Sequence, residues 1–273
     1  MKRSAMSQQS EEKPLKILQI TDLHILQETG ETMLGIDTEH YFQAVVQQAV
    51  SNSHFDLVLV TGDLTQHPCL ASYRRIHNEL QKLHTPCLCL PGNHDDFAQM
   101  QQVFQGPDIS CDKQKLLANW QIICLNSQIP DSPCGRLSNA ELEFLQSCLQ
   151  QHPERFAMIA VHHHCIPSNC QWMDIMQIEN SAQLLELLTR YPQVRAITFG
   201  HIHQDLHCRQ NNLEIFAAPA TCFQFNLDSK EFALQQTPPG YRIFNLYPDG
   251  RIDSQVLRLP DRLTELQMDS EGY

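Results

Sequence analysis

The chain has 273 residues, of which 42% are hydrophobic, so it can bury a substantial core and is not expected to be disordered. Its formal net charge of −12 repels phosphate backbones and argues against general binding of nucleic acids. No stretch approaches the about 18 apolar residues of a membrane span, and the eleven cysteines, without any C-x-x-C pair, are typical of reduced thiols in the cytoplasm.

In chain order, the sequence begins with a polar segment at 1–14. This segment, MKRSAMSQQSEEKP, has a basic start but no apolar stretch behind it, so it does not fit a secretory signal and we expect a flexible tail. Short apolar runs then alternate with helical patterns, which is typical of an α/β sheet. The first half is predicted to contain strands at 16–20, 57–60 and 87–90 and helices at 38–53 and 70–84, with Asp37 capping the first helix.

The second half continues this alternation and then changes to strands alone. Ser138 and Glu141 have the spacing of a capping box, which predicts a helix from there to about residue 151. The turn residues YPDGR at 247–251 predict a hairpin between the last two strands. The other expected elements are a helix at 180–190 and strands at 120–125, 156–161, 196–199, 213–218, 241–246 and 252–257.

The organisation of the chain is that of one unit. No internal repeat, low-complexity linker or charge run divides it. We therefore expect a single α/β domain at 15–260, with two sheets packed face to face and helices outside, and a polar C-terminal tail at 261–273.

Polar clusters follow five of the predicted strands. In α/β sheets, ligands bind beyond the carboxyl ends of the strands, where loops from several strands converge. Side chains from all five clusters are therefore expected to meet. The clusters are DLH (22–24), GD (62–63), GNHDD (92–96), HHHC (162–165) and GHIH (200–203).

The residue types in these clusters suit divalent metal ions. Carboxylates and neutral imidazoles together favour Mn, Fe, Zn or Co. Asp22 and His24 are two apart in a segment expected to be extended, so their side chains should point to the same side, and His201 and His203 repeat this spacing. Asp63 could bridge two ions about 3.5–4 Å apart, the spacing of two-metal hydrolytic sites.

Two details of the clusters bear on how the ligands are placed. Gly62, Gly92 and Gly200 each precede an expected ligand, where the missing side chain lets the backbone approach an ion. Within the histidine run, alternation along a strand would put His162 and His164 on one face and His163 on the other, which leaves the choice of ligand open.

The order DLH … GD … GNHD … HHH … GHIH resembles the calcineurin-like metallophosphoesterase superfamily. The segments ILQITDLH, LPGNHD, VHHHCIPSNCQWMD, GHIHQ, APATCFQF and SEGY resemble its bacterial class III 3',5'-cyclic-AMP phosphodiesterases. The resemblance implies a four-layer α/β/β/α sandwich of two mixed β-sheets flanked by helices. It also implies two divalent metal ions (Fe, Mn, Mg or Zn), one held by Asp22, His24, Asp63 and His203 and the other by Asp63, Asn93, His162 and His201.

The resemblance further implies a reaction, the hydrolysis of 3',5'-cyclic AMP to 5'-AMP. His94 would protonate the departing 3' oxygen, and Asp95 would hydrogen-bond this imidazole and fix its orientation. The substrate would be bound by His24, Asn93, His94 and His203. Relatives commonly have a proline after the histidine run, where this chain has Cys165, which is expected to be a buried thiol.

Other functions stay open at this point. The same site could act on 2',3'-cyclic nucleotides, glycerophosphodiesters or aryl phosphodiesters, because nothing in the composition locates a base pocket, although Trp172 could line one. A noncatalytic metal or nucleotide sensor is a further alternative, against which the pair His94 and Asp95 argues. We expect a cytoplasmic monomer or homodimer whose partner is a small cyclic nucleotide, neither a nucleic acid nor a membrane.

Overall fold

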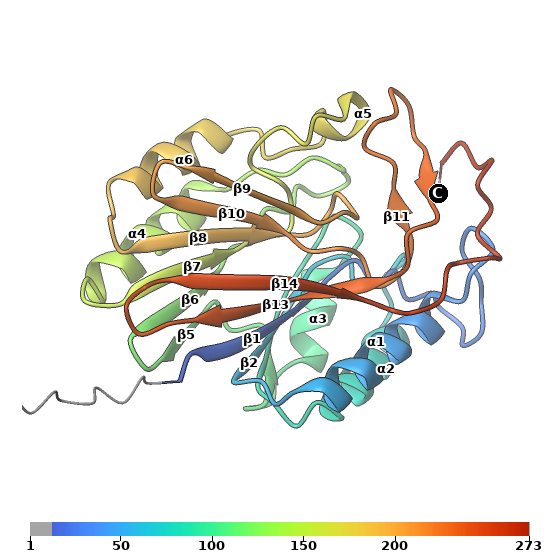
Figure 1. Ribbon diagram of the computed structural model, residues 1–273, viewed down its shortest axis with the longest axis horizontal. Coiled ribbons are helices and arrows are strands. Elements are labelled where there is room, and N and C mark those ends of the chain that lie inside the picture. Colours follow the sequence, from blue (N-terminus) through green and yellow to red (C-terminus); the bar gives the residue numbers. More distant parts are fainter. Residues whose placement is uncertain (1–12, 273) are drawn as a thin grey trace, which may run out of the picture.

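Two six-stranded β-sheets face each other in the computed structural model, which describes residues 13–272 (Figure 1). Residues 1–12 of the predicted N-terminal tail lie outside the described residues. The first sheet is mixed. Its four strands from the first half of the chain run parallel to one another, and its two strands from the end of the chain pair antiparallel. Its spatial order is β14 (Ile252–Arg258), β13 (Gly240–Leu246), β1 (Leu15–Ile20), β2 (Leu57–Thr61), β3 (Cys87–Leu90) and β4 (Ile109–Ser110).

The second sheet is also mixed, with parallel strands at its centre and an antiparallel strand at each edge. Its spatial order is β5 (Gln114–Leu117), β6 (Trp120–Cys124), β7 (Phe156–Ala160), β8 (Val194–Phe199), β10 (Leu213–Ala217) and β9 (Leu206–Gln210). A separate two-stranded ribbon consists of β11 (Gln224–Phe225) and β12 (Leu234–Gln235).

Helices cover the outer face of each sheet, which confirms the predicted four-layer sandwich. Alternation along β1 shows why: Ile17 packs between the sheets, whereas Leu18 and Ile20 pack on the helical side. The first sheet is covered by α1 (Thr38–Asn52), α2 (Leu70–Gln81) and α3 (Phe97–Val103). The second sheet is covered by α4 (Asn139–Gln151) and α6 (Ser181–Thr189), and the short α5 (Gln171–Asp174) lies near the β11 ribbon.

The predicted helix caps are present. Asp37 accepts a hydrogen bond from the backbone N–H of His40 (3.0 Å), and Ser138 Oγ accepts one from the N–H of Glu141 (3.2 Å). The return bond of the capping box is replaced, because the Glu141 carboxylate accepts from Asn126 N (3.1 Å) and pairs with Lys113 Nζ (2.7 Å). Glu141 thus ties α4 to the second sheet.

The segment after residue 260, expected to be a polar tail, packs against the fold. Leu263 and Leu266 are buried in the core of the second sheet, and Gln267 N donates to Leu34 O (2.9 Å). In Figure 1 this red segment runs beside the blue loop that follows β1. Burial of the two leucines stabilises this otherwise polar stretch, because each buried leucine contributes about 1.5–3 kcal/mol.

A buried glutamine joins the two sheets next to the loops that carry the polar clusters. Gln19 of β1 is fully buried, and its amide donates to Thr61 Oγ1 (2.9 Å) and to Phe199 O (3.2 Å). Its carbonyl oxygen accepts from Thr198 Oγ1 (2.6 Å). Every polar group of Gln19 is paired, so the carboxyl ends of β1, β2 and β8 are held together. No helix among residues 13–272 is both long and apolar enough to span a membrane.

Candidate metal centre

The five polar clusters meet beyond the carboxyl ends of β1, β2, β3, β7 and β8, as predicted. Asp63 lies at the middle of this centre. Its Oδ2 is 3.8 Å from His24 Nε2 and 3.3 Å from His162 Nε2, while its Oδ1 accepts from the backbone N–H of His94 (2.9 Å). One carboxylate therefore contacts two separate imidazoles, which is the geometry expected of a bridging ligand.

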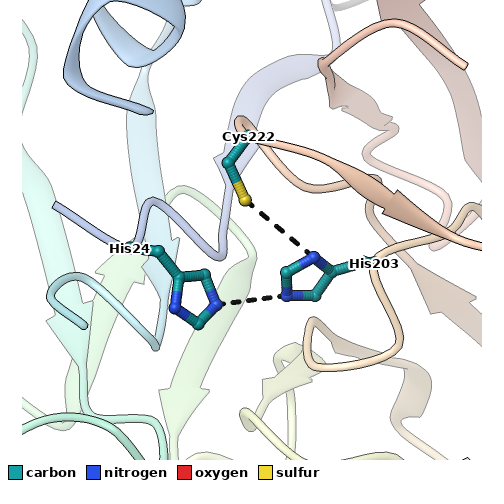
Figure 2. Close-up of side chains that lie close together, drawn as sticks. All are labelled: His24, His203 and Cys222. Atoms are coloured by element: carbon teal, nitrogen blue, oxygen red, sulfur yellow. Dashed lines mark hydrogen bonds between the residues drawn. The ribbon is translucent and has the colours of Figure 1, made fainter. Parts of the chain in front are cut away.

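The first group of donors surrounds His24 and His203. Their Nε2 atoms lie 3.2 Å apart (Figure 2). Asp22 Oδ1 is 3.5 Å from His203 Nε2. Each ring is fixed from behind, because His24 Nδ1 donates to Gln66 Oε1 (2.6 Å) and His203 Nδ1 donates to Phe223 O (2.9 Å). In neutral imidazoles so bonded, both Nε2 atoms present lone pairs to each other, which favours a shared cation.

The second group surrounds His162. Its Nε2 lies 3.2 Å from Asn93 Oδ1, and its Nδ1 donates to Thr61 O (2.8 Å). The ring of His201 packs against that of His162 with centroids 5.1 Å apart, and the backbone N–H of His201 donates to both oxygens of Asp22 (3.1 Å each). His201 Nε2 is buried without a hydrogen-bond partner among the described residues. This orphaned nitrogen and the donor set fit a second cation.

The backbone at these residues differs from the sequence prediction. Asp22, His24, Asp63, His201 and His203 all have a left-handed backbone, with φ between 45° and 65°. The expected extended segments, in which alternation would align the side chains, are therefore wrong at 22–24 and 201–203. A left-handed backbone at a non-glycine residue costs about 1–3 kcal/mol and is concentrated at functional sites. The five residues converge through these turns rather than through strand alternation.

The three predicted glycines lie against the centre. A Cβ at Gly62 would collide with the imidazole of His162, and one at Gly92 would collide with the carboxylate of Asp63. A Cβ at Gly200 would collide with Thr21 and approach Asp22 Oδ2 at 2.7 Å. The backbone thus lies close to expected ligand side chains at all three positions, and of the three only Gly62 has a positive φ (+93°).

The acidic and basic side chains at the centre shift the pKa values of one another. Burial raises the pKa of Asp22 to about 7, and the nearby Asp63 adds to this effect. Burial alone would raise the pKa of Asp63, but His162, His94 and His24 hold it well below its ordinary value. Burial would lower the pKa of His162, yet the carboxylates of Asp63 and Asp22 raise it to about 9. Without a metal ion the centre therefore holds protons where cations would bind.

The remaining imidazoles are in the form that binds metals. Burial lowers the pKa of His24 to about 4, and burial with neighbouring imidazoles lowers the pKa of His201 and His203 well below the ordinary value. Neutral imidazoles and ionised carboxylates are the ligand forms of borderline divalent metals. The residues present therefore fit a centre of two divalent cations.

The role predicted for Asp95 is wrong in its geometry. Its carboxylate accepts hydrogen bonds from the backbone N–H groups of Leu64 (3.1 Å), Thr65 (3.2 Å) and Gly92 (2.9 Å), and from the hydroxyl of Tyr73 (3.1 Å). The imidazole of His94 is bonded elsewhere, with Nδ1 3.3 Å from Gln66 O. Asp95 thus shapes the loop that carries Asn93 and His94 instead of orienting the His94 ring.

The histidine run does not alternate as a strand would, because β7 ends at Ala160. The ring of His163 lies beside that of His162 (centroids 4.9 Å apart), and its Nδ1 is 2.7 Å from Ser127 Oγ. His164 lies with Nε2 3.6 Å from Asp174 Oδ1. Cys165 is buried, as expected.

Several neighbours of the centre were not singled out from the sequence. Gln66 follows the GD motif, and Phe223 and Cys222 lie in the APATCFQF segment, but a glutamine or cysteine at such a place carries no distinctive signal. Cys222 Sγ is 3.9 Å from His203 Nδ1, whereas His24 contacts the other ring nitrogen, Nε2 (Figure 2). Trp172 packs 5.0 Å from the ring of Phe225, which itself stacks on His203 at 4.1 Å.

Comparison with known proteins agrees with this geometry. Residues 15–205 match the family described as calcineurin-like phosphoesterase. The chain is 36% identical over 267 residues to "3',5'-cyclic adenosine monophosphate phosphodiesterase CpdA" of Haemophilus influenzae, which covers 97% of each chain. It is 37% identical over 261 residues to the protein of that name in Escherichia coli K12, with 95% of each chain covered.

Solved structures agree on the fold. A dimetal phosphatase from Danio rerio superposes with a TM-score of 0.63 at 14% identity, covering 90% of this chain and 99% of the other. GAP50, described as the anchor in the inner membrane complex of Plasmodium, superposes with a TM-score of 0.58 at 13% identity, covering 90% of this chain and 85% of the other. Proteins with such different roles in their names share the architecture, so this likeness concerns the fold alone. With the family match over 191 residues (15–205) and the two long alignments, the chain belongs to the calcineurin-like phosphoesterase family.

Proposed function

We propose that the protein hydrolyses 3',5'-cyclic AMP to 5'-AMP at a centre of two divalent metal ions and so lowers the cyclic AMP concentration in the cell. The observation that carries the proposal is the identity of 36–37% over 95–97% of the chain with relatives named cyclic-AMP phosphodiesterases. The convergence of the polar clusters beyond five strand ends supports the same reaction, because two-metal centres are typical of phosphoester hydrolysis.

One cation would be held by Asp22, His24, Asp63 and His203, and the other by Asp63, Asn93, His162 and His201. The ions would be Fe, Mn, Mg or Zn, and the number of imidazoles favours Fe, Mn or Zn over Mg. Bound there, they would supply Lewis acidity, which neutralises phosphate charge and acidifies water.

The chain's own residues would handle the substrate and the proton. His94, protonated, would give its proton to the departing 3' oxygen. Its backbone N–H donates to Asp63 Oδ1, and its ring Nδ1 lies 3.3 Å from Gln66 O. The phosphate would be contacted by His24, Asn93, His94 and His203. Asp95 would act by holding the loop of Asn93 and His94 through its three backbone hydrogen bonds.

Related proposals concern the chain as a whole. We propose a single domain that begins at residue 15 and includes the packed segment after residue 260, and that works in the cytoplasm as a monomer or homodimer, without a nucleic-acid or membrane partner. The net charge of −12 supports the absence of nucleic acid. The free thiols of all eleven cysteines support a reducing compartment.

The experiment is a substrate panel assayed with the metal-stripped protein after separate addition of Mn, Fe, Mg and Zn. The panel contains 3',5'-cyclic AMP, 2',3'-cyclic AMP, glycerophosphocholine and bis(p-nitrophenyl) phosphate. We expect kcat/KM to be highest for 3',5'-cyclic AMP, with 5'-AMP as product. Turnover of another member with cyclic AMP untouched would assign a different substrate, and no turnover with tight nucleotide binding would indicate a sensor.

A further inference from the structure

Gln66 contacts the imidazoles of both His24 and His94, which the proposed reaction needs. It is 8% exposed and belongs to the loop after β2, three residues beyond Asp63. Its side chain contacts His24, and its main-chain carbonyl contacts His94. A single residue therefore contacts one expected metal ligand and the expected proton donor.

The side-chain contact sets the ring of His24. Gln66 Oε1 accepts a hydrogen bond from His24 Nδ1 at 2.6 Å, which places the proton on Nδ1 and leaves the lone pair on Nε2. That Nε2 lies 3.2 Å from His203 Nε2 and 3.8 Å from Asp63 Oδ2, among the other donors. Partners of this kind fix the tautomer and orientation of a ligating histidine.

The main-chain contact sets the ring of His94 independently of the side chain. Gln66 O lies 3.3 Å from His94 Nδ1, and Gln66 N donates to Ile25 O (3.1 Å), next to His24. The backbone at this position is thus tied to the segment of His24 whatever side chain it carries. Substitution of the side chain should therefore change the orientation of the His24 ring and leave the hydrogen bond to His94 in place.

We propose that Gln66 is a positioning residue with two separable parts: its side-chain amide prepares His24 to bind a divalent cation, and its carbonyl aligns His94 with the leaving oxygen. The inference rests on the proposed function for the role of His94. For His24 it rests on the donor geometry alone.

The test is a titration of the metal-stripped full chain with Mn²⁺, followed by calorimetry, for the wild type, Gln66→Leu and Gln66→Glu. Leucine has a similar volume without an acceptor, and we expect the Kd for Mn²⁺ to rise about 10–100-fold. Glutamate restores the acceptor, and its Kd should stay within about threefold of the wild type. At saturating Mn²⁺, kcat of Gln66→Leu for cyclic AMP should remain within about threefold, since the carbonyl is retained.

Gln121→Leu is the matched control. Gln121 in β6 is fully buried and makes two hydrogen bonds, accepting from Gln114 Nε2 (3.0 Å) and donating to His152 O (3.2 Å), with neither partner in the described centre. We expect it to lower the melting temperature and leave the Kd for Mn²⁺ unchanged.

Three results would overturn the proposal. If Gln66→Leu binds Mn²⁺ with the wild-type Kd, the side chain does not position His24. If Gln66→Glu binds Mn²⁺ as weakly as Gln66→Leu, the side chain acts by packing and not by hydrogen bonding. A large loss of kcat in Gln66→Leu at saturating Mn²⁺ would show that the side chain and the carbonyl of Gln66 do not act separately. If the wild type binds Mn²⁺ but does not hydrolyse cyclic AMP, the proposed function fails, while the Kd comparison still decides the role toward His24.

Discussion

Replacement of Asp63 tests the bridging assignment, because its carboxylate contacts the imidazoles of His24 and His162, one from each group of donors. Asp63→Ala should lose bound metal and lower kcat/KM by at least about 100-fold, since both cations would lose a shared ligand. Asp63→Asn, which keeps the shape, should behave similarly. Metal content measured by mass spectrometry beside the rate is the readout. An active, metal-replete Asp63→Ala protein would reject the assignment.

His94 differs from the metal ligands in the result expected. His94→Ala should keep its metal content and hydrolyse cyclic AMP about 10²–10⁴-fold more slowly, the usual loss for a missing general acid. With bis(p-nitrophenyl) phosphate, whose leaving group departs without a proton, the loss should be much smaller. Equal losses for the two substrates would speak against a proton donor, and loss of metal would make His94 a ligand.

The protonation of Asp22 and His162 makes metal binding depend on pH. Their pKa values of about 7 and about 9 in the metal-free protein mean that both carry protons at pH 6 and that both are deprotonated only above pH 9. A cation must displace these protons, so the apparent metal affinity should rise from pH 6 to pH 9. Calorimetry in buffers of different ionisation enthalpy measures the protons released. An affinity independent of pH in this range contradicts the coupling.

The residue types of the centre were predictable from the sequence, but their backbone conformations were not. Asp22, His24, Asp63, His201 and His203 were found because ligand-type residues follow apolar runs. Their left-handed φ angles depend on the packing of several loops against one another, which no local pattern reports. Similarly, the backbone partners of Asp95 belong to a loop 30–31 residues earlier in the chain as well as to its own turn.

At the scale of the element, the adjacent carboxylates of Asp95 and Asp96 have different roles in the turn from β3 to α3. Asp95 accepts three backbone hydrogen bonds inside the fold, whereas Asp96 caps α3 by accepting from Gln99 N (3.0 Å). Asp96 explains why α3 begins directly after the site. The helix has seven residues with one of them, Met100, buried, so the sequence offered too little periodicity to predict it.

Asp95→Ala should therefore act chiefly on stability. Leaving buried N–H groups without an acceptor should lower the free energy of unfolding by about 3 kcal/mol, whereas Tyr73→Phe, which removes one donor to the carboxylate, should cost about 1 kcal/mol. Urea denaturation of the metal-free proteins measures both. Wild-type stability in Asp95→Ala with an altered pH profile of turnover would instead return Asp95 to a role in orienting His94.

Long helices and strands with a clear hydrophobic period were easier to predict from the sequence than short ones. The strands and helices of the regular β–α alternation, such as β1, α1 and α4, were placed within a few residues, because buried positions recur at the proper period. The short edge or ribbon strands β4, β5, β9, β11 and β12 were missed, whereas the longer edge strand β14 was predicted. In β9 the side chains are largely exposed or half-buried, and β4, β11 and β12 have two residues each, so their assignment depends on a neighbouring strand.

At the scale of the whole molecule, the C-terminal segment completes the core of the second sheet. Leu263 is fully buried, so Leu263→Ala should lower the free energy of unfolding by about 2–5 kcal/mol. Met268, which is 38% exposed, is the control, and Met268→Ala should change it by less than about 0.5 kcal/mol. Equal stability of Leu263→Ala and the wild type would show that the segment is a free tail after all.

The packing of Leu263 in one cluster with Met33 has a consequence for how the protein is made. β1 lies between β2 and β13, so one of its neighbours is synthesised more than two hundred residues later. A nascent chain on the ribosome can pair β1 with β2 early. The first sheet is complete only after β13 is synthesised, and the core of the second sheet only after Leu263 is synthesised. Assembly of the enzyme is therefore a late event of translation, and chaperones would meet the unfinished halves while their apolar faces are still uncovered.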